Sequence, residues 1–200
     1  MQGVVIREII IFYDELNKKA VGSLNIRTMC YNKHKHVVSK GRCSMPKNES
    51  KEDYKAKEIL SNIQSEEHVQ EMKNYIQHGN VSTYEHCENV ARLSYRIDDA
   101  FSLHSDLEVL LTGAMLHDFF LYDWHKKGDG THQLHGFQHA GRASENAKKY
   151  FDIDERTNHV IYSHMWPLNP KRIPRSREAW IVCVADKWVS LQETLFRRHV

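Results

Sequence analysis

Apolar residues recur at the three- and four-residue spacing of α-helices over residues 53–200, and this periodicity most constrains the fold. It predicts helices at 54–64, 66–77, 83–101, 106–120, 136–151, 154–165 and 176–196. Ser65, Ser82 and Ser105 precede three of these helices, and the last two have the capping-box glutamate three residues later. No convincing period-two alternation occurs. We predict an all-α domain, a single helical bundle with a polar loop at 125–132 and a Pro-bounded loop at 167–174.

The first 52 residues differ in charge from the rest of the chain. They carry 10 basic and 5 acidic residues, against 18 basic and 21 acidic residues in the remainder. Residues 30–52 are polar, basic and aperiodic, which is typical of a connector rather than a core element. We predict a basic, poorly ordered extension at 1–52 before a domain at 53–200. The extension lacks the interleaved aromatic residues that stack bases, so nucleic-acid binding is not favoured.

The overall composition indicates neither a polyanion-binding nor a membrane protein. The net charge is +2 with neutral histidines, so no global attraction to nucleic acid or anionic lipid is expected. The most apolar stretch, residues 4–13, is interrupted by Arg7 and Glu8 and falls short of the roughly 18 residues that a membrane span needs. The four cysteines form no CxxC pair. We expect a cytoplasmic protein with a small-molecule partner; the oligomeric state is left open.

Polar residues that end or interrupt apolar helical stripes are the main functional signal. His86 shares a stripe with Val90, Leu93 and Ile97, and such a histidine alone is more often a hydrogen-bonded core residue than a ligand.

The neighbouring pair His117 and Asp118 gives a stronger signal. The two residues lie seven after Leu110 and Leu111, at the C-terminal end of the next apolar face. A carboxylate in a core costs several kcal/mol unless it is paired or binds a cation, and the negative end of the helix dipole adds to that cost. A metal ion removes both objections, although a salt bridge to a buried Arg or Lys remains the alternative.

Three further helices repeat the pattern. Asp186 lies within an apolar stripe, His164 follows Val160 and Ile161 at helical spacing, and His139 precedes a stripe of small residues. The ligand-type side chains directed inward are therefore His86, His117, Asp118, His139, His164 and Asp186. Mixed imidazole and carboxylate ligands suit Mn, Fe, Co, Ni or Zn rather than Ca. Four of these residues fill most of one shell, and all six suit two ions bridged by Asp118.

The order of these residues resembles the H…HD…D signature of the HD-domain superfamily of metal-dependent phosphohydrolases. The resemblance covers roughly residues 66–196 and includes the segments TYEHCENVARLS, LLTGAMLHD and CVADKW. His139, in HGFQHAGRASENA, and His164, in VIYSHMWPL, resemble the additional ligands of the branch that binds two metal ions. Two departures put cyclic-dinucleotide cleavage in doubt: Leu121 stands where many phosphodiesterase members have Lys, and the GYP element of that branch is missing.

The resemblance implies hydrolysis of a phosphate ester of a small nucleotide or phosphorylated metabolite, with one or two divalent ions. The expected catalytic residues are Asp118, Lys187 and Arg142, the last two to compensate phosphate charge. Further candidates are Arg172 and Arg175 as cations, and Asp123, His125, His132 and His135 beside the presumed mouth of the site. Three alternatives stay open: a nucleotidase or cyclic-nucleotide phosphodiesterase rather than a general phosphatase, a di-iron oxygenase on the same ligands, and a degenerate HD domain that senses nucleotides.

Overall fold

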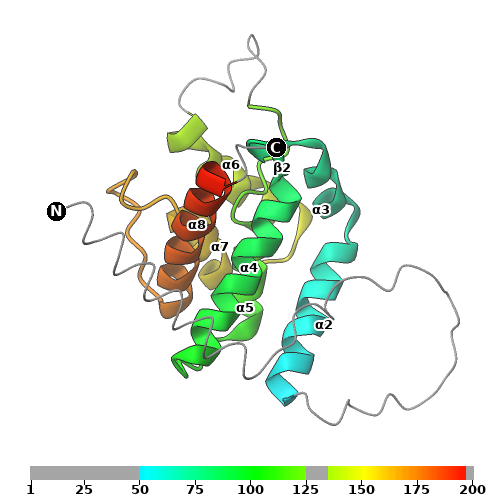
Figure 1. The fold of residues 1–200 in the computed structure, drawn as a ribbon, viewed down its shortest axis with the longest axis vertical. Coiled ribbons are helices and arrows are strands. Elements are labelled where there is room, and N and C mark those ends of the chain that lie inside the picture. The colour runs from blue at the N-terminus through cyan, green and yellow to red at the C-terminus, as the bar shows by residue number, and fades with distance from the viewer. Residues whose placement is uncertain (1–49, 125–134, 197–200) are drawn as a thin grey trace, which may run out of the picture. The chain divides into compact units, whose positions relative to one another are not determined.

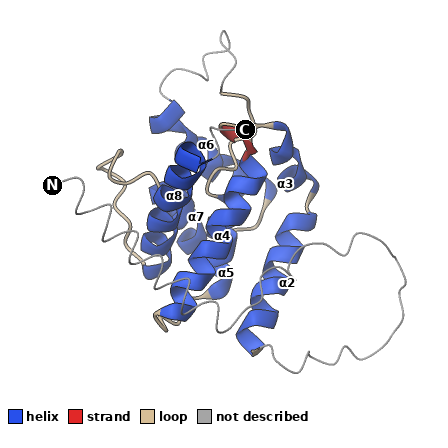
Figure 2. Ribbon diagram, in the orientation of Figure 1, coloured by secondary structure: helices blue, strands red, loops and turns tan. Residues whose placement is uncertain are grey.

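The helices predicted from the periodicity are present in the structure, a computed structural model that describes residues 50–124 and 135–196. Their bounds are α2 (Lys51–Ser65), α3 (Glu67–Glu71), α4 (Thr83–Ala100), α5 (Leu107–Leu116), α6 (His135–Tyr150), α7 (Glu155–Ser163) and α8 (Arg177–Phe196), as Figures 1 and 2 show. The predicted all-α class is confirmed. The extension at 1–52 lies almost wholly outside the described residues, as does the loop at 125–132, and the domain boundary after residue 52 stays a prediction.

Helix α5 is the central element of the bundle. Eight of its ten residues are buried, and it packs against α4, α7 and α8, while α6 covers α7. Gly113 permits the close approach of α5 to α7, because a Cβ atom at this position would lie 2.6 Å from Val160 Cγ1. Any side chain at residue 113 therefore forces α5 and α7 apart.

A short β-hairpin replaces the second half of the helix predicted at 66–77, so that prediction is wrong beyond Glu71. The chain continues as the 3₁₀-helix η2 (Met72–Asn74) and the antiparallel strands β1 (Ile76–His78) and β2 (Val81–Ser82). Gly79, at φ 60°, makes the turn. The Thr83 amide donates a hydrogen bond to the Tyr75 carbonyl at 2.8 Å and closes the hairpin at the start of α4. Tertiary contacts thus override a helical sequence pattern.

The helix-start signals are confirmed in one case and displaced in two. Ser82 forms the predicted capping box with Glu85 at the start of α4. At α5 the cap is Asp106, one residue beyond the predicted Ser105, and its carboxylate accepts from the Glu108 amide at 3.1 Å. Ser65 is the last residue of α2, where its hydroxyl donates to the Asn62 carbonyl.

Helices α5 and α7 end earlier than the periodicity predicts. The predicted ends are residues 120 and 165, whereas α5 ends at Leu116 and α7 at Ser163, which makes His117 and His164 the C-cap residues. Two of the predicted ligands therefore stand at helix termini, where the last backbone carbonyls have no partner within the helix.

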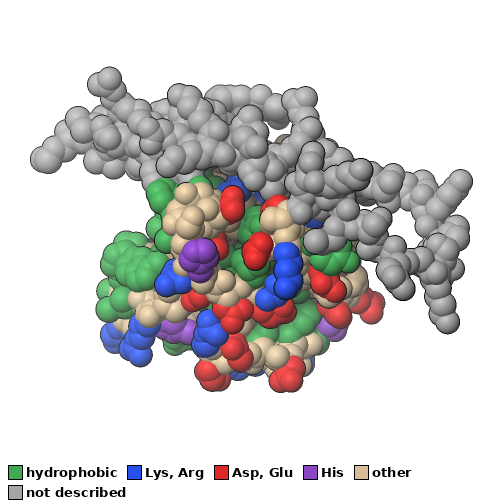
Figure 3. Space-filling model, turned by 90° about the horizontal axis from the view of Figure 1, so that it is seen from below, with side chains coloured by type: hydrophobic (Ala, Val, Ile, Leu, Met, Phe, Trp, Pro, Cys, Tyr) green, Lys and Arg blue, Asp and Glu red, His purple; other side chains and the backbone are tan. Residues whose placement is uncertain are grey.

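Of the helices in the described ranges, none is both long and apolar enough to cross a lipid bilayer. On the face that Figure 3 draws, basic and acidic side chains are interspersed.

Candidate metal centre

Five helices direct the six predicted ligand residues into one buried cluster. Helix α4 carries His86, the end of α5 carries His117 and Asp118, α6 carries His139, the end of α7 carries His164, and α8 carries Asp186. Each of the six is at most 6% exposed. The structure brings the whole predicted set together, while the role of these residues as metal ligands stays a prediction.

Asp118 lies between two pairs of histidines, one facing each of its carboxylate oxygens. Its Oδ2 atom is 3.7 Å from His86 Nε2 and 3.4 Å from His117 Nε2. Its Oδ1 atom is 3.2 Å from His139 Nε2 and 3.5 Å from His164 Nε2. A carboxylate in this position has the arrangement that a bridging ligand requires.

The second carboxylate belongs to only one side of the cluster. Asp186 Oδ1 lies 3.3 Å from His86 Nε2 and 3.7 Å from His117 Nε2. We call His86, His117 and Asp186 the inner group, and His139 and His164 the outer pair. The Nε2 atoms of the outer pair are 3.0 Å apart.

The spacing of these atoms fits coordination to metal ions. Metal–ligand bonds of about 2.0–2.2 Å place two ligands of one ion roughly 3–3.5 Å apart, close to the separations in both groups. Two triads, His86–His117–Asp186 and His117–Asp118–His164, hold their ligand atoms within 4.8 Å of one another. Among the described residues, buried His117 Nε2 and Asp118 Oδ1 find no hydrogen-bond partner. The donor set and these two atoms therefore fit a divalent transition metal.

Backbone carbonyls at two helix ends orient His117 and His164. His117 Nδ1 lies 2.7 Å from the Ala114 carbonyl, and His164 Nδ1 lies 2.7 Å from the Ile161 carbonyl. Both carbonyls belong to the last turn of a helix and lack an acceptor role within it. Donation from Nδ1 leaves the lone pair of a neutral imidazole on Nε2, the nitrogen that faces Asp118.

Glu193 supports His86 and was not predicted from the sequence. Its Oε2 atom lies 2.8 Å from His86 Nδ1, and its Oε1 atom accepts from Asn89 Nδ2 at 3.1 Å. The residue is 3% exposed and follows Asp186 by seven positions, so both lie on one face of α8. The seven-residue spacing from Asp186 is the sequence feature that could have identified Glu193. A carboxylate behind a ligating histidine fixes its orientation and raises its basicity.

The side chains alone shift the pKa values of His86 and His164 in opposite directions. Burial by itself lowers the pKa of His86, but hydrogen bonds with Asp186 and Glu193 outweigh it and raise the pKa to about 10. Burial likewise opposes ionisation of Asp118 and Asp186, yet the facing histidines hold both pKa values well below the usual range. Burial dominates at His164 and lowers its pKa to about 4.

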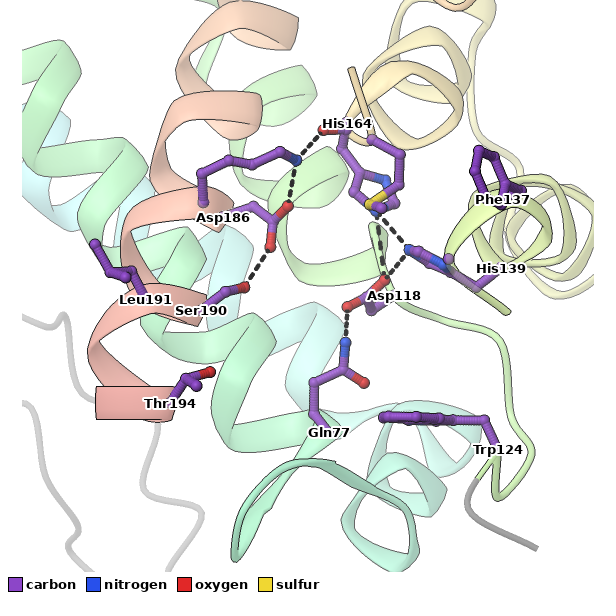
Figure 4. Close-up of a pocket in the computed structure, with 13 residues that line it drawn as sticks. Gln77, Asp118, Trp124, Phe137, His139, His164, Asp186, Ser190, Leu191 and Thr194 are labelled. Carbon is purple, nitrogen blue, oxygen red and sulfur yellow. Dashed lines mark hydrogen bonds and ion pairs between the residues drawn. The ribbon is translucent and has the colours of Figure 1, made fainter. Parts of the chain in front are cut away.

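A cavity of about 740 Å³ opens over the cluster. Asp118, Asp186 and the outer pair line it (Figure 4), whereas the fully buried His86 and His117 are not among its lining residues. Aromatic and aliphatic side chains form much of the remaining wall; they are Trp124, Phe137, Met165 and Leu191. The outer pair therefore faces the space that a ligand would occupy.

Of the predicted cations, Lys187 lines this cavity. Its Nζ atom donates to Asp186 Oδ2 at 2.9 Å and to the His164 carbonyl at 2.6 Å. Arg142 is exposed and lies over the Tyr122 ring, with 5.1 Å from Cζ to the ring centroid. Arg142 does not line the cavity in the part of the chain that the structure describes.

The remaining predicted candidates contribute less. Arg172 lies over the Tyr162 ring, and the Arg175 amide donates to His159 Nε2. Neither residue is part of the described cavity wall, and Asp123 is not part of it either. His125 and His132 lie outside the described residues, as does the side chain of His135. Leu121, at the position where many phosphodiesterases have Lys, packs against the hydrophobic core.

A buried His–Asp cluster that could hold a metal ion lies where five helices of an all-α domain converge, beside a cavity. Residues 83–189, more than half of the chain, match the family model of the HD domain. The chain belongs to the HD-domain family, whose members are generally metal-dependent phosphohydrolases. No curated protein and no solved structure gives a significant match.

Proposed function

We propose that this protein is a metal-dependent phosphatase that hydrolyses a phosphate ester of a small nucleotide or phosphorylated metabolite. One observation carries the proposal: Asp118 lies at the floor of the cavity, with each of its oxygens facing a different pair of histidines. This arrangement suits two ions with one carboxylate between them. The cavity volume is in the range of small-molecule sites.

The two groups divide the proposed ligands. The inner group with Asp118 Oδ2 would hold one ion, and the outer pair with Asp118 Oδ1 would hold the other. The imidazole and carboxylate set favours Mn, Fe, Co, Ni or Zn. Bound ions supply Lewis acidity at the phosphoryl oxygens and lower the pKa of water in the site.

Lys187 is the proposed phosphate-binding residue of the chain itself. Lys187 lines the cavity, and its Nζ atom donates to Asp186 Oδ2, which places its positive charge beside the proposed phosphate position. In the proposed reaction water adds its oxygen to phosphorus, the ester P–O bond breaks, and the leaving oxygen takes a proton. Arg142, over Tyr122, has no part in this proposal.

The test is a screen of phosphorylated metabolites and nucleotides with the metal-replete full-length protein, with elemental analysis of the same preparation. We expect phosphate release without oxygen consumption, and its loss in Asp118→Asn. Substrate-dependent oxygen uptake by an iron-loaded protein would replace the proposal with a di-iron oxygenase. Nucleotide binding without phosphate release or oxygen uptake would replace it with a sensor domain.

A further inference from the structure

Gln77 is a buried polar residue at the floor of the cavity that the ligand set does not include. It lies on β1 of the hairpin, six residues before the segment that matches the family model. Only 6% of its surface is exposed, and it lines the same cavity as Asp118. A short hairpin therefore adds an amide to a site otherwise built from helices.

The neighbouring carboxylate fixes the orientation of the Gln77 amide. Gln77 Nε2 lies 2.5 Å from Asp118 Oδ2. An ionised carboxylate only accepts hydrogen bonds, so the NH₂ group must face Asp118 and the carbonyl oxygen must point away from it. Figure 4 shows Oε1 on the side of Trp124.

The Oε1 atom has no hydrogen-bond partner within residues 50–124 and 135–196. Leaving such an acceptor buried and unpaired is costly, which makes an O–H or N–H donor the favoured occupant of the adjacent space. Gln77 lines the cavity, and its amide extends from Asp118 toward Trp124, so the organic part of a substrate whose phosphate lies at Asp118 would be the group next to Oε1.

The wall near this acceptor is aromatic. Trp124 lines the cavity on the side of Gln77 and offers the apolar surface against which a flat group packs, whereas Phe137 lies beyond His139. A hydrogen-bond acceptor beside an aromatic ring selects a planar group that carries a donor at its edge.

We propose that Gln77 determines substrate specificity: its Oε1 accepts a hydrogen bond from an O–H or N–H of the organic part of the substrate, which packs against Trp124. The inference rests on the proposed function and narrows it to phosphomonoesters with a flat organic group that bears a donor. A site built to pair with such a donor discriminates strongly against analogues that lack it.

The test measures binding, so it does not depend on turnover. Benzylphosphonate and its 2-, 3- and 4-hydroxy isomers have no ester bond to hydrolyse and differ only in the donor and its position. Calorimetric titration of the Mn²⁺-loaded full-length protein should show one hydroxy isomer binding roughly tenfold or more tightly than benzylphosphonate. Gln77→Leu should remove this preference, and the readout is the ratio of the two affinities, because the variant also loses the hydrogen bond from Gln77 Nε2 to Asp118 and so changes both affinities together.

Gln64→Leu is the matched control. Gln64 lies on α2, where its amide donates to Glu88 at 3.2 Å, and it does not line the cavity. This variant should keep the wild-type preference. Equal affinity of the wild type for all four probes, or no binding of any, would overturn the inference, as would a preference that survives in Gln77→Leu.

A crystal structure and the hydrolysis assay distinguish the remaining outcomes. If Gln77→Leu loses metal or fails to fold, a crystal structure of the wild type with its preferred isomer decides, and a hydroxyl that does not contact Gln77 Oε1 overturns the inference. If the wild type discriminates among the probes but hydrolyses no phosphate ester, the proposed reaction fails and the specificity role stands. If the wild type hydrolyses a phosphate ester but binds all four probes equally, the proposed reaction stands and the specificity role of Gln77 fails.

Discussion

The inner group and the outer pair each contain two histidines, but the inner group also contains Asp186, and one of its histidines has a carboxylate behind it. In the inner group a carboxylate backs His86, since Glu193 lies 2.8 Å from Nδ1, and neither histidine is among the residues that line the cavity. In the outer pair a backbone carbonyl backs His164, and both histidines line the cavity. The pKa of His86 is raised to about 10 while that of His164 is lowered to about 4. We therefore expect the inner group to hold its ion more tightly and the outer pair to face the substrate.

Replacing the carboxylate shared by the two sides should have the largest effect. Asp118→Ala removes an oxygen from each proposed ion position, so we expect loss of most bound metal and a fall in activity beyond the 10–100-fold that an outer hydrogen-bond partner costs. Elemental analysis and phosphate release check this. Full metal retention would show that Asp118 is not a ligand.

The outer pair and the inner group should separate in single histidine variants. His164→Ala should lower the metal content from about two ions to about one, because it removes a ligand of the outer ion. His86→Ala should weaken binding of the inner ion and lower the metal content more than His164→Ala does. Competition with a graded series of chelators measures both. If the two variants lose the same amount of metal, the inner group and the outer pair do not differ in metal affinity. If His139→Ala and His164→Ala both keep their metal content and turnover, the site holds one ion.

Glu193 tests the support of the inner group. Glu193→Gln keeps the size of the side chain but removes its charge, and we expect metal affinity to fall by about 10–100-fold. Glu145→Gln, at an exposed position of α6, is the matched control and should not change affinity. An equal affinity of Glu193→Gln and the wild type would show that His86 needs no carboxylate partner.

The smallest effect concerns α7, the helix that ends at the outer pair. Asp154 is its N-cap and accepts from the Thr157 amide at 2.7 Å, so Asp154→Ala should reduce the free energy of unfolding by about 1 kcal/mol. The Thr157 hydrogen bonds lower the pKa of Asp154, so this contribution is present above the unfolded pKa and is lost as pH falls through the folded value.

Denaturant titrations at several pH values measure this contribution. The difference between wild type and Asp154→Ala should be constant above about pH 5 and shrink below about pH 4. Asp152→Ala, at an exposed position just before α7, is the control and should leave the free energy of unfolding nearly unchanged. A difference that grows on acidification would contradict the capping role.

Helical periodicity was sufficient to predict the residues on long, regular faces. His86, His139 and Asp186 lie within α4, α6 and α8, where spacing along the sequence translates directly into direction. Asp118 followed from the cost of a charge at the end of an apolar face, and His117 and His164 followed from their helical spacing to the apolar residues before them. The family resemblance rests on the same residues.

The features missed by the sequence analysis depend on tertiary contacts. Gln77 reaches Asp118 because the chain turns into a hairpin where the local pattern is helical, and no spacing rule relates residues 41 positions apart. Glu193 lies on the face of Asp186, but its partner is on another helix, so periodicity alone does not distinguish it from a solvated glutamate. Arg142 follows His139 by three positions, yet its side chain lies over Tyr122.

The central claim is that Asp118 lies between two ion positions. Anomalous diffraction from crystals of the protein loaded with a transition metal tests it most directly. We predict two peaks, one beside Asp118 Oδ2 among His86, His117 and Asp186, and one beside Oδ1 at His139 and His164. A single peak away from Asp118, or no peak within the cluster, would contradict the account.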